Sequence, residues 1–538
     1  MENITTMNKA SAPLSYNTRM QARFILAFVF IVSYVSLLVG GHRGGKKLVP
    51  NAANHRDPPP SPWGLPLIGN LHQLGSLPHR SLRSLAAAHG PIMLIRLGQV
   101  PAVVVSSASA AREVLQAQDH VFASRPSLTI PRRLLYGCTD IAFAPHGPYW
   151  RGARKMSVRH LLSPPRVRAY RAVREQEVEA LVQRVLEQAC RGGGGVVRLS
   201  ELMSDFAKDV AGRIVLGLRA AGDNGWRAKV DALLEESNVL LAAFHVGDYI
   251  PWLSWVTYVD GTDSRVRRAF ERIDRILDEI VDAAATRETP LSEEEASDDA
   301  FIHVLLSLQQ EEPTPTAGTG EWRLSRDNVK ALLEDLFGAG TEATIIVLEW
   351  AMAELLRNKG AMQKLQREVR QARSISSDIV GEQDLAGMEY LRAVIKETMR
   401  LHTPGPLLLP HQSMQATRIS HGYDVPSDTM VIVNAWAIGR DPKAWESPEE
   451  FRPERFVGSG VDFRGQHFQL IPFGAGRRMC PGVNLAMSVV ELALANLVAR
   501  FDWALPEGEA ELDMEETTGC TSRKKAPLCA VATQRCFC

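Results

Sequence analysis

The feature that most constrains this chain is a ten-residue loop, Phe473 to Gly482 (FGAGRRMCPG), built around a single cysteine. Its glycines and proline let the backbone fold tightly around Cys480, and an apolar run typical of a helix starts directly after it. We therefore expect Cys480 at a helix N-terminus, where free amides and the nearby Arg477 and Arg478 favour thiolate over thiol. A thiolate held in this way is either a nucleophile or a metal ligand.

The ligand requirements of metals narrow the choice. A zinc site normally needs four donors, or three plus water, and no His or Cys partner stands near Cys480 in the sequence. A haem iron needs only one axial ligand from the protein, because the porphyrin supplies four. On the residues alone, a structural cysteine is an equal alternative, since free cysteines often behave as small hydrophobic residues.

Composition excludes several classes of protein. The chain has 538 residues, of which 45% are hydrophobic and 23% charged, so it is not wholly disordered, collagen-like or a polytopic membrane protein. Lys plus Arg and Asp plus Glu are equal at 61 each, so no global basic field exists and no nucleic-acid partner is expected. Seven cysteines spread thinly over the chain are unlike a disulfide scaffold and indicate a reduced, cytosol-facing body.

The N-terminal region predicts a membrane anchor. After a polar segment, 1–23, residues 24–41 carry no charge, and eighteen helical residues span roughly 27 Å, close to a bilayer's hydrocarbon thickness. A signal peptide or a buried core helix are the alternatives, and basic residues on both sides leave the orientation open. A basic, proline-rich linker, 42–66, and a body, 67–538, follow; five of nine residues in Pro58 to Pro66 are proline, which favours extended chain.

Hydrophobic periodicity predicts a mainly helical body with small β-sheets. Short β-branched runs predict strands at Pro101 to Ser106 and at Met430 to Val433. Gly192 to Gly195 and Glu288 to Gly320 read as surface loops. Long helices are expected at Arg166 to Arg191, Arg265 to Ala285, Arg326 to Asn358, Leu391 to His402 and Gly482 to Arg500.

The cysteine loop resembles a known signature. Phe473, Gly476, Arg478, Cys480 and Gly482 match the Phe-x-x-Gly-x-Arg-x-Cys-x-Gly pattern of haem-thiolate monooxygenases, the cytochrome P450 superfamily, and the chain is similar to its plant microsomal A-type group. The resemblance runs from the anchor to about residue 527. It implies the P450 fold, mainly α with small β-sheets and a single N-terminal transmembrane helix. It also implies that Cys480 is the axial ligand of a haem b iron, that Phe473 packs by the sulfur and that Arg478 reaches a haem propionate.

Two further constellations match the family. Glu397 and Arg400 share a helix face at i,i+3, and the resemblance places Arg455 with them in a buried structural cluster; the alternative is a solvated ion pair. Trp150 and Arg154 lie one helical turn apart and match a pair that binds a haem propionate, against the alternative of a Trp anchor with a surface Arg.

A stripe of basic residues follows the same helix as Trp150 and Arg154. Arg151, Lys155 and Arg159 recur every four residues and are expected either to steer an acidic reductase or to form a solvated face.

His411 stands where relatives commonly have an Arg that assists the propionates, and a neutral His would weaken that contact.

The segment Gly338 to Thr344 (GAGTEAT) resembles the oxygen-side helix of the family. Two mid-helix glycines cost roughly 1 kcal/mol each and mark a kink or a close ligand approach. In the family an acid and the following Thr relay protons to oxygen. This chain has Glu342 but Ala343 in place of that Thr, so Thr344, or Thr341 through water, is the expected substitute.

Family analogy locates five mostly apolar or small substrate-contacting segments, which predict a lipophilic ligand, although core side chains would look the same. They are Ser124 to Ala144, Asn238 to Tyr258, Glu334 to Ala339, Thr403 to Leu408 and Gly519 to Ser522.

The resemblance implies a membrane-bound monooxygenase of plant specialised metabolism. It would lie in the endoplasmic reticulum membrane as a single-pass protein with its catalytic domain on the cytosolic face. It would use O2, and NADPH electrons delivered by a cytochrome P450 reductase. Two alternatives are a dehydratase or isomerase without net oxygenation, prompted by Ala343, and a non-catalytic haem carrier.

Overall fold

A computed structural model describes most of the chain after its first 56 residues. The described residues are 57–191, 195–217, 239–286, 300–310, 324–372, 379–508, 511–517 and 519–535, with Lys229, Asp231, Leu234, Glu236 and Ser237. The predicted anchor at 24–41 lies outside the described residues, as do the last three residues of the chain.

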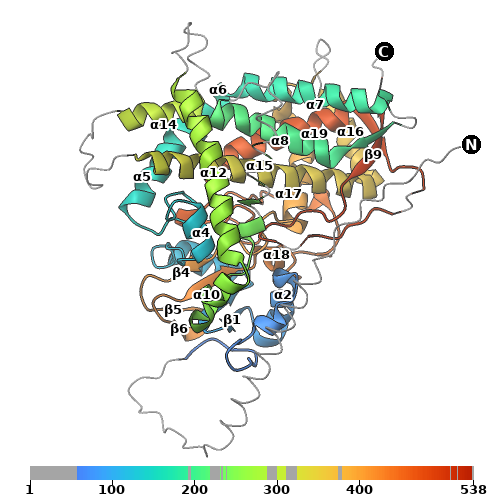
Figure 1. The fold of residues 1–538 in the computed structure, drawn as a ribbon. Coiled ribbons are helices and arrows are strands. Elements are labelled where there is room, and N and C mark those ends of the chain that lie inside the picture. Colours follow the sequence, from blue (N-terminus) through green and yellow to red (C-terminus); the bar gives the residue numbers. More distant parts are fainter. Residues whose placement is uncertain are drawn as a thin grey trace, which may run out of the picture.

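Helices make up most of the body, with α6 and α7 across the top of Figure 1 and α12 standing in front. The first helices are α2 Pro78–His89, α3 Ala108–Arg112, α4 Thr129–Leu134, α5 Pro148–Ser157, α6 Pro164–Ala169, α7 Arg171–Arg191 and α8 Leu199–Leu216. The middle ones are α10 Val246–Tyr249, α11 Val256–Val259, α12 Thr262–Ala285, α14 Phe301–Gln310 and α15 Arg326–Arg357. The last are α16 Lys359–Ala372, α17 Glu389–Leu401, α18 Ala435–Ile438 and α19 Val483–Arg500.

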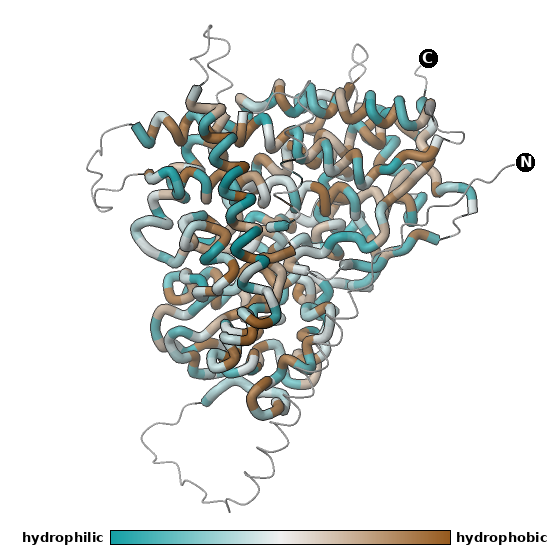
Figure 2. Tube along the Cα trace, viewed as in Figure 1, coloured by the Kyte–Doolittle hydropathy of each residue, from teal (hydrophilic) through white to brown (hydrophobic). Residues whose placement is uncertain are grey.

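Two mostly buried helices, α15 and α19, pack together at the centre of the body. In α15 every residue from Thr344 to Leu356 is buried, and this helix packs against α8, α17 and α19. A helix that is hydrophobic all round must be buried. By contrast, polar and apolar residues alternate along the outer helices α7 and α12 (Figure 2), as expected of helices with one solvent-exposed face.

The strands of the described residues form three small sheets. The largest has the order β1-β2-β7-β4, in which β2 and β7 run parallel with Val103 opposite Val431. The others are β3-β9-β8 and β5-β6. The strands are β1 Ile92–Leu97, β2 Val100–Val105, β3 Val196–Arg198, β4 His411–Gln412, β5 Thr417–Ile419, β6 Tyr423–Val425, β7 Met430–Val433, β8 Phe501–Ala504 and β9 Cys529–Gln534.

Within the described residues the predicted elements agree with this architecture in all but two places, and residues 192–194 of the predicted loop Gly192 to Gly195 lie outside those residues. The helix predicted over 166–191 is divided at Tyr170, whose ψ of 12° closes α6 while its ring stays buried. The loop predicted over 288–320 was wrong in its middle, because α14 lies there and buries Phe301, Ile302 and Leu305. Its acidic and proline-containing flanks masked a short apolar stretch with helical spacing.

The proline-rich segment Pro58 to Pro66 lies against the body. The Pro60 carbonyl accepts the Leu94 N–H of β1 at 2.8 Å, and the Asn70 side chain donates to the carbonyls of Pro62 and Trp63 at 3.3 and 3.2 Å. The carbonyls of Pro62 and Trp63 have no strand partner, and the buried Asn70 side chain satisfies them instead.

One helix among the described residues, α19, is long and apolar enough to cross a membrane. It is 72% buried inside the body, as a core helix would be.

Candidate active site

The cysteine loop takes the geometry that its glycines permit. Cys480 lies three residues before the first residue of α19, and its N–H donates to the Phe473 carbonyl at 2.9 Å. Gly476 has φ +66°, and a Cβ there would stand 1.7 Å from the Leu115 carbonyl oxygen. Only glycine fits at position 476, because both the backbone angle and the space exclude a side chain.

The Cys480 thiol is accessible at its surface but is surrounded by protein. The residue has accessible surface, yet surrounding protein raises the pKa of its thiol by burial. The Gly482 N–H and the charge of Arg154 act in the opposite direction and favour the thiolate. Asp335 of α15 is near enough to raise the same pKa, so α15 faces the cysteine loop.

Three cationic side chains converge near Cys480: Arg125, which is buried, and Arg154 and Arg478, which are partly buried. Burial lowers the pKa of Arg125 to about 10, although Asp140 and Asp335 oppose that shift. Burial lowers the pKa of Arg478 to about 9, and the charge of Arg125 lowers it further. Burial also lowers the pKa of Arg154, and the negative charge of the Cys480 thiolate opposes that shift. Buried like charges are costly unless an anion lies between them. This part of the site is therefore suited to an anionic ligand.

Each predicted propionate contact has a backbone partner in the structure. The Trp150 indole N–H donates to the Ile141 carbonyl at 3.1 Å, and Arg154 donates from Nη2 to the Met479 carbonyl at 2.6 Å. Arg478 donates from Nε and Nη2 to the carbonyls of Ala123 and Ala144, both at 2.6 Å.

The Arg478 guanidinium also stacks on an aromatic ring. Its Cζ lies 4.1 Å from the Trp150 ring centroid, which is cation–π geometry. The structure thus brings Trp150, Arg154 and Arg478 together around the cysteine loop.

His411 lies at the edge of the same cluster. Its Nδ1 is 2.8 Å from the Phe122 carbonyl oxygen, so Nδ1 carries the proton and donates. Burial, together with the charges of Arg125 and Arg478, lowers the pKa of His411 to about 3. The imidazole is therefore neutral and adds no positive charge to the three arginines.

Small residues of α15 face away from the core. Ala339 and Gly340 are exposed, although α15 is buried from Thr341 to Leu356 except at Ala343. A Cβ added at Gly340 would meet no atom within 4 Å. The middle of this helix therefore leaves room for a flat ligand to approach its backbone.

The hydroxyl groups next to this surface bond within α15. Thr341 donates to the Phe337 carbonyl at 2.8 Å, and Thr344 donates to the Gly340 carbonyl at 2.7 Å. Such bonds satisfy the hydroxyl within its own helix and tend to bend it. Neither threonine is directed to Glu342 in this arrangement.

Glu342 is held by the loop before β9. Arg523 donates from Nε and Nη2 to its two carboxylate oxygens, and the Thr521 hydroxyl donates to Oε1 at 3.0 Å. Glu342 is 7% exposed and Arg523 is more open. The predicted proton-relay acid is thus paired with a cation that was not expected from the sequence.

Glu397, Arg400 and Arg455 meet in a buried cluster. Arg400 donates to both oxygens of Glu397 at 2.7 and 2.8 Å, and Arg455 donates from Nε to Glu397 Oε1 at 3.0 Å. The remaining Arg400 donors reach the carbonyls of Gly439, Pro448 and Glu450. Each charge is therefore satisfied, which a buried charge requires.

Two residues that the sequence did not single out organise the loop over the site. Arg125 donates from Nη1 to the carbonyls of Leu409 and Pro410 and from Nε to that of Ala142. Asp335 accepts the N–H groups of Ile141 and Ala142 at 2.9 and 3.1 Å. The only signal for Arg125 was a lone basic residue in an apolar stretch, which does not reveal its partners.

Part of one predicted substrate-contacting segment lies on the surface. Within 238–258, Trp252, Trp255 and Tyr258 are 45%, 54% and 69% exposed. Such large aromatic surfaces face outward and do not line an interior site.

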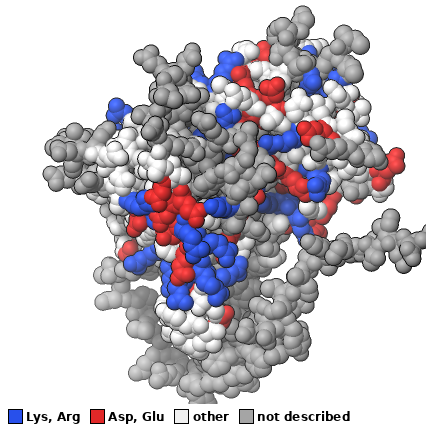
Figure 3. All heavy atoms as spheres, turned by 45° about the horizontal axis from the view of Figure 1, so that its top comes forward, with Lys and Arg blue, Asp and Glu red and all other residues white. Residues whose placement is uncertain are grey.

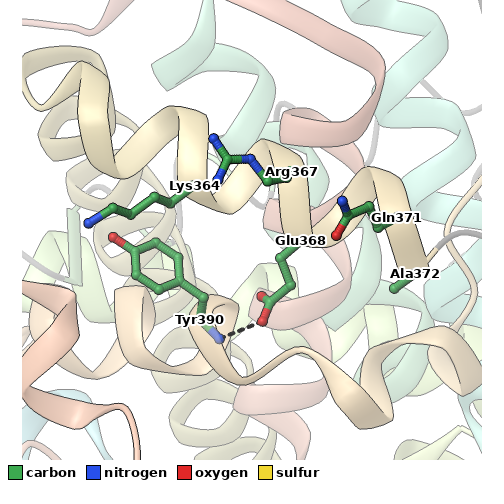
Figure 4. Close-up of a pocket in the computed structure, with 6 residues that line it drawn as sticks. All are labelled: Lys364, Arg367, Glu368, Gln371, Ala372 and Tyr390. Carbon is green, nitrogen blue, oxygen red and sulfur yellow. Dashed lines mark hydrogen bonds between the residues drawn. The ribbon is translucent and has the colours of Figure 1, made fainter.

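A separate surface groove lies between α16 and α17 (Figure 4). It is lined by Lys364, Arg367, Glu368, Gln371, Ala372 and Tyr390, and Glu368 accepts the Tyr390 N–H at 2.8 Å. It contains none of the predicted site residues, so the cysteine loop is the candidate active site.

Comparison with known proteins agrees with this geometry. Residues 58–530 match the family Cytochrome P450. Cytochrome P450 736A117 of Prunus mume is 43% identical over 512 residues, which is 94% of this chain and 95% of that protein. A norfluorocurarine oxidase of Strychnos is 45% identical and covers 90% of this chain and 94% of its own length. The structure of a zebra fish cytochrome P450 with progesterone superposes with a TM-score of 0.70 at 26% identity, covering 85% of this chain and 99% of that one.

The fold and these matches define an oxidoreductase of the haem monooxygenase class. The chain belongs to the cytochrome P450 family, which implies a haem cofactor, dioxygen and a small-molecule substrate. The residues present fit a haem: one cysteine sulfur, three buried or partly buried arginines suited to its propionates, and small residues on the facing helix.

Proposed function

We propose that the chain is a membrane-bound haem-thiolate monooxygenase that inserts one oxygen atom into a lipophilic small molecule of plant specialised metabolism. The observation that carries the proposal is Cys480, a single sulfur at the start of a core helix with Arg154 beside it. The name of the Strychnos relative, an oxidase of norfluorocurarine, supports the substrate class.

Cys480 would hold the haem iron through its sulfur, with Phe473 packed by that sulfur. Arg154 and Arg478, with Arg125, would hold the propionates, helped by the Trp150 N–H, while the neutral His411 would serve as an uncharged neighbour. When bound, the haem supplies the redox chemistry that splits dioxygen, and the thiolate favours that cleavage.

The other site residues have supporting roles in this proposal. Glu342 and Thr344 would move protons on the oxygen side of α15. Glu397, Arg400 and Arg455 would keep the segment before the cysteine loop in place, because breaking a buried ion cluster strands a charge.

Electrons would come from NADPH through a separate reductase. Arg151, Lys155 and Arg159 are exposed, on α5 and the turn directly after it, and form a basic stripe that suits an acidic flavoprotein. Elsewhere the surface carries both signs: Figure 3 shows Lys and Arg next to Asp and Glu across one face, with no uniform basic field there.

Membrane attachment would come from residues 24–41 together with an aromatic surface near α10 and α11. This aromatic band consists of Phe244, Trp252, Trp255, Tyr258 and Val259, all exposed. Trp and Tyr favour the membrane–water interface, because their rings are apolar with one polar group. We propose the endoplasmic reticulum membrane, with the body on the cytosolic face.

A second candidate keeps the haem without net oxygenation, as a dehydratase or isomerase. Ala343 favours it, since the nearby hydroxyls of Thr341 and Thr344 bond within their own helix.

One experiment tests both candidates. Lipophilic plant metabolites, including oximes, indoles, terpenoids and phenylpropanoids, are screened for a change in the haem absorption spectrum, and NADPH and oxygen consumption per product is then measured for each hit. A monooxygenase consumes one of each per product, whereas a dehydratase consumes neither. Absence of any substrate-induced spectral change would favour a non-catalytic haem carrier.

A further inference from the structure

The ion pair between Glu342 and Arg523 joins the middle of α15 to solvent. Both carboxylate oxygens of Glu342 are engaged by Arg523, and Thr521 adds a third donor. The Glu342 side chain is 9% exposed and that of Arg523 is 43% exposed. One end of the pair therefore lies in the body and the other reaches water.

The loop that carries Arg523 is fixed on both sides. The Trp350 indole N–H of α15 donates to the Ser522 carbonyl at 2.7 Å, and the Ser522 N–H donates to the Pro404 carbonyl at 3.0 Å. Because the backbone next to Arg523 is anchored to α15 and to the segment after α17, the Cα of Arg523 has a defined position. The backbone therefore needs no further ordering for the two-point contact of the guanidinium with Glu342.

The neighbouring hydroxyl groups are already bonded within α15. Thr341 and Thr344 donate to carbonyls of their own helix, and Ala343 has no hydroxyl. Between positions 338 and 344, Glu342 is the one ionisable side chain. A proton that crosses this part of the helix by way of a side-chain acid must therefore use Glu342.

We propose that Arg523 is the positioning residue of Glu342 and forms the solvent end of the proton route to the oxygen side of α15. This rests on the proposed monooxygenase function. Hydroxylation of a C–H bond consumes one O2, two electrons and two protons and yields one hydroxyl group and one water. Arg523 stays charged and transfers no proton itself. Water at its exposed end supplies a proton to the Glu342 carboxylate. Glu342 passes this proton on to the oxygen side of α15 and then takes up another proton from water.

The test needs no organic substrate. With full-length haem-loaded enzyme, reductase, NADPH and O2 alone, electrons leave as hydrogen peroxide, which takes two electrons and two protons, or as water, which takes four of each. The ratio of NADPH oxidised to peroxide formed is one when peroxide is the sole product and rises continuously above one as a larger share of the electrons ends in water. We expect a wild-type ratio above one, because an intact proton route delivers protons fast enough for part of the oxygen to be reduced to water.

Arg523→Gln and Glu342→Gln are both expected to lower the fraction of electrons recovered as water by about tenfold, less than the ~10²–10⁴-fold typical of general acid–base groups. The double variant should be no worse than the worse single one, since both act on one route. Arg523→Lys keeps the charge and should recover part of the loss. Lys525→Gln is the matched control: Lys525 pairs with Glu515 on the same loop at 2.6 Å with both side chains exposed, and its loss should leave the ratio unchanged.

A second readout does not depend on turnover. The thermal midpoints of the same variants should fall non-additively, which shows that Arg523 and Glu342 are coupled in the folded protein. The inference is overturned by additive losses, by an Arg523→Gln ratio equal to that of wild type, by an unchanged ratio in Glu342→Gln, or by a wild-type ratio of one. A thiolate-type carbon monoxide spectrum in every variant separates these outcomes from failure of the proposed function, which would remove that spectrum from the wild-type enzyme.

Discussion

Arg400 contacts both carboxylate oxygens of Glu397, one turn earlier on α17, and neither side chain has any exposure to solvent. The pair sits at i,i+3, a spacing that on a helix surface contributes little. Burial changes its weight, because removing one partner leaves an uncompensated charge in a low-dielectric interior.

Glu397→Gln is therefore expected to destabilise the body by ~3–5 kcal/mol, measured as the free energy of unfolding from urea denaturation. A matched control exists in Glu201, which pairs with Arg198 at the same i,i+3 spacing and 3.1 Å but with both side chains more than half exposed. Glu201→Gln should cost less than ~1 kcal/mol. Equal losses in the two variants would mean that the buried cluster carries no special weight.

Gly476→Ala is expected to abolish the cysteine loop, because the new Cβ would overlap the Leu115 carbonyl. Gly458 is the control: its φ of +65° nearly equals the +66° of Gly476, but a Cβ there would meet nothing within 4 Å. Gly458→Ala should cost only ~1 kcal/mol for the backbone angle, whereas Gly476→Ala should lose haem binding as well as stability. Soret absorbance per protein and thermal midpoints report the two effects, and normal haem loading of Gly476→Ala would contradict the expectation.

Glu334 makes stability depend on pH. Burial raises the pKa of this α15 carboxyl from its ordinary 4.5 to about 8; the Ser237 hydroxyl, 3.0 Å away, opposes the shift, and Asp140 and Asp335 add to it. The folded state thus holds a proton that the unfolded state releases above pH 4.5, so stability falls as pH rises from about 4.5 to 8.

Glu334→Gln should remove this fall. Its stability advantage over wild type should be near zero at pH 4.5 and approach ~4 kcal/mol at pH 8. Thermal midpoints at both pH values check this. The exposed Glu271 is the control, since Glu271→Gln should shift both midpoints equally. A constant difference between Glu334→Gln and wild type would refute the assignment.

The aromatic band is expected to touch lipid. In full-length protein reconstituted in bilayer nanodiscs with brominated acyl chains, Trp252→Phe and Trp255→Phe together should lower the quenched fraction of tryptophan fluorescence. Trp503→Phe, on β8 next to β9 at the far upper right of Figure 1, should not. Unchanged quenching in the Trp252 and Trp255 double variant would place this surface in water.

Local patterns predicted most of the fold. The helices at α12, α15, α17 and α19 begin and end within a few residues of their predicted bounds, because 3.6-residue periodicity and capping are local properties. The same holds for β2 and β7, whose β-branched runs are short and clearly bounded. The α14 helix was not predicted, because the acidic and proline-containing residues on both sides of it made the whole stretch 288–320 look like a loop.

The site was predicted less completely than the fold. Cys480, Trp150, Arg154 and Arg478 stand in recognisable motifs and do lie together. Arg125, Asp335 and Arg523 act through partners far along the chain, and their place is decided by how loops fold over α15. Nothing in their immediate sequence records those partners.

The most direct test of the account is the absorption spectrum of the reduced protein with carbon monoxide. If Cys480 is the thiolate ligand of haem iron, the wild-type enzyme should show the strongly red-shifted Soret band that thiolate ligation produces, and Cys480→Ala should lose it. Haem-loaded, folded protein that lacks this band, or a Cys480→Ala variant that keeps it, would contradict the central claim.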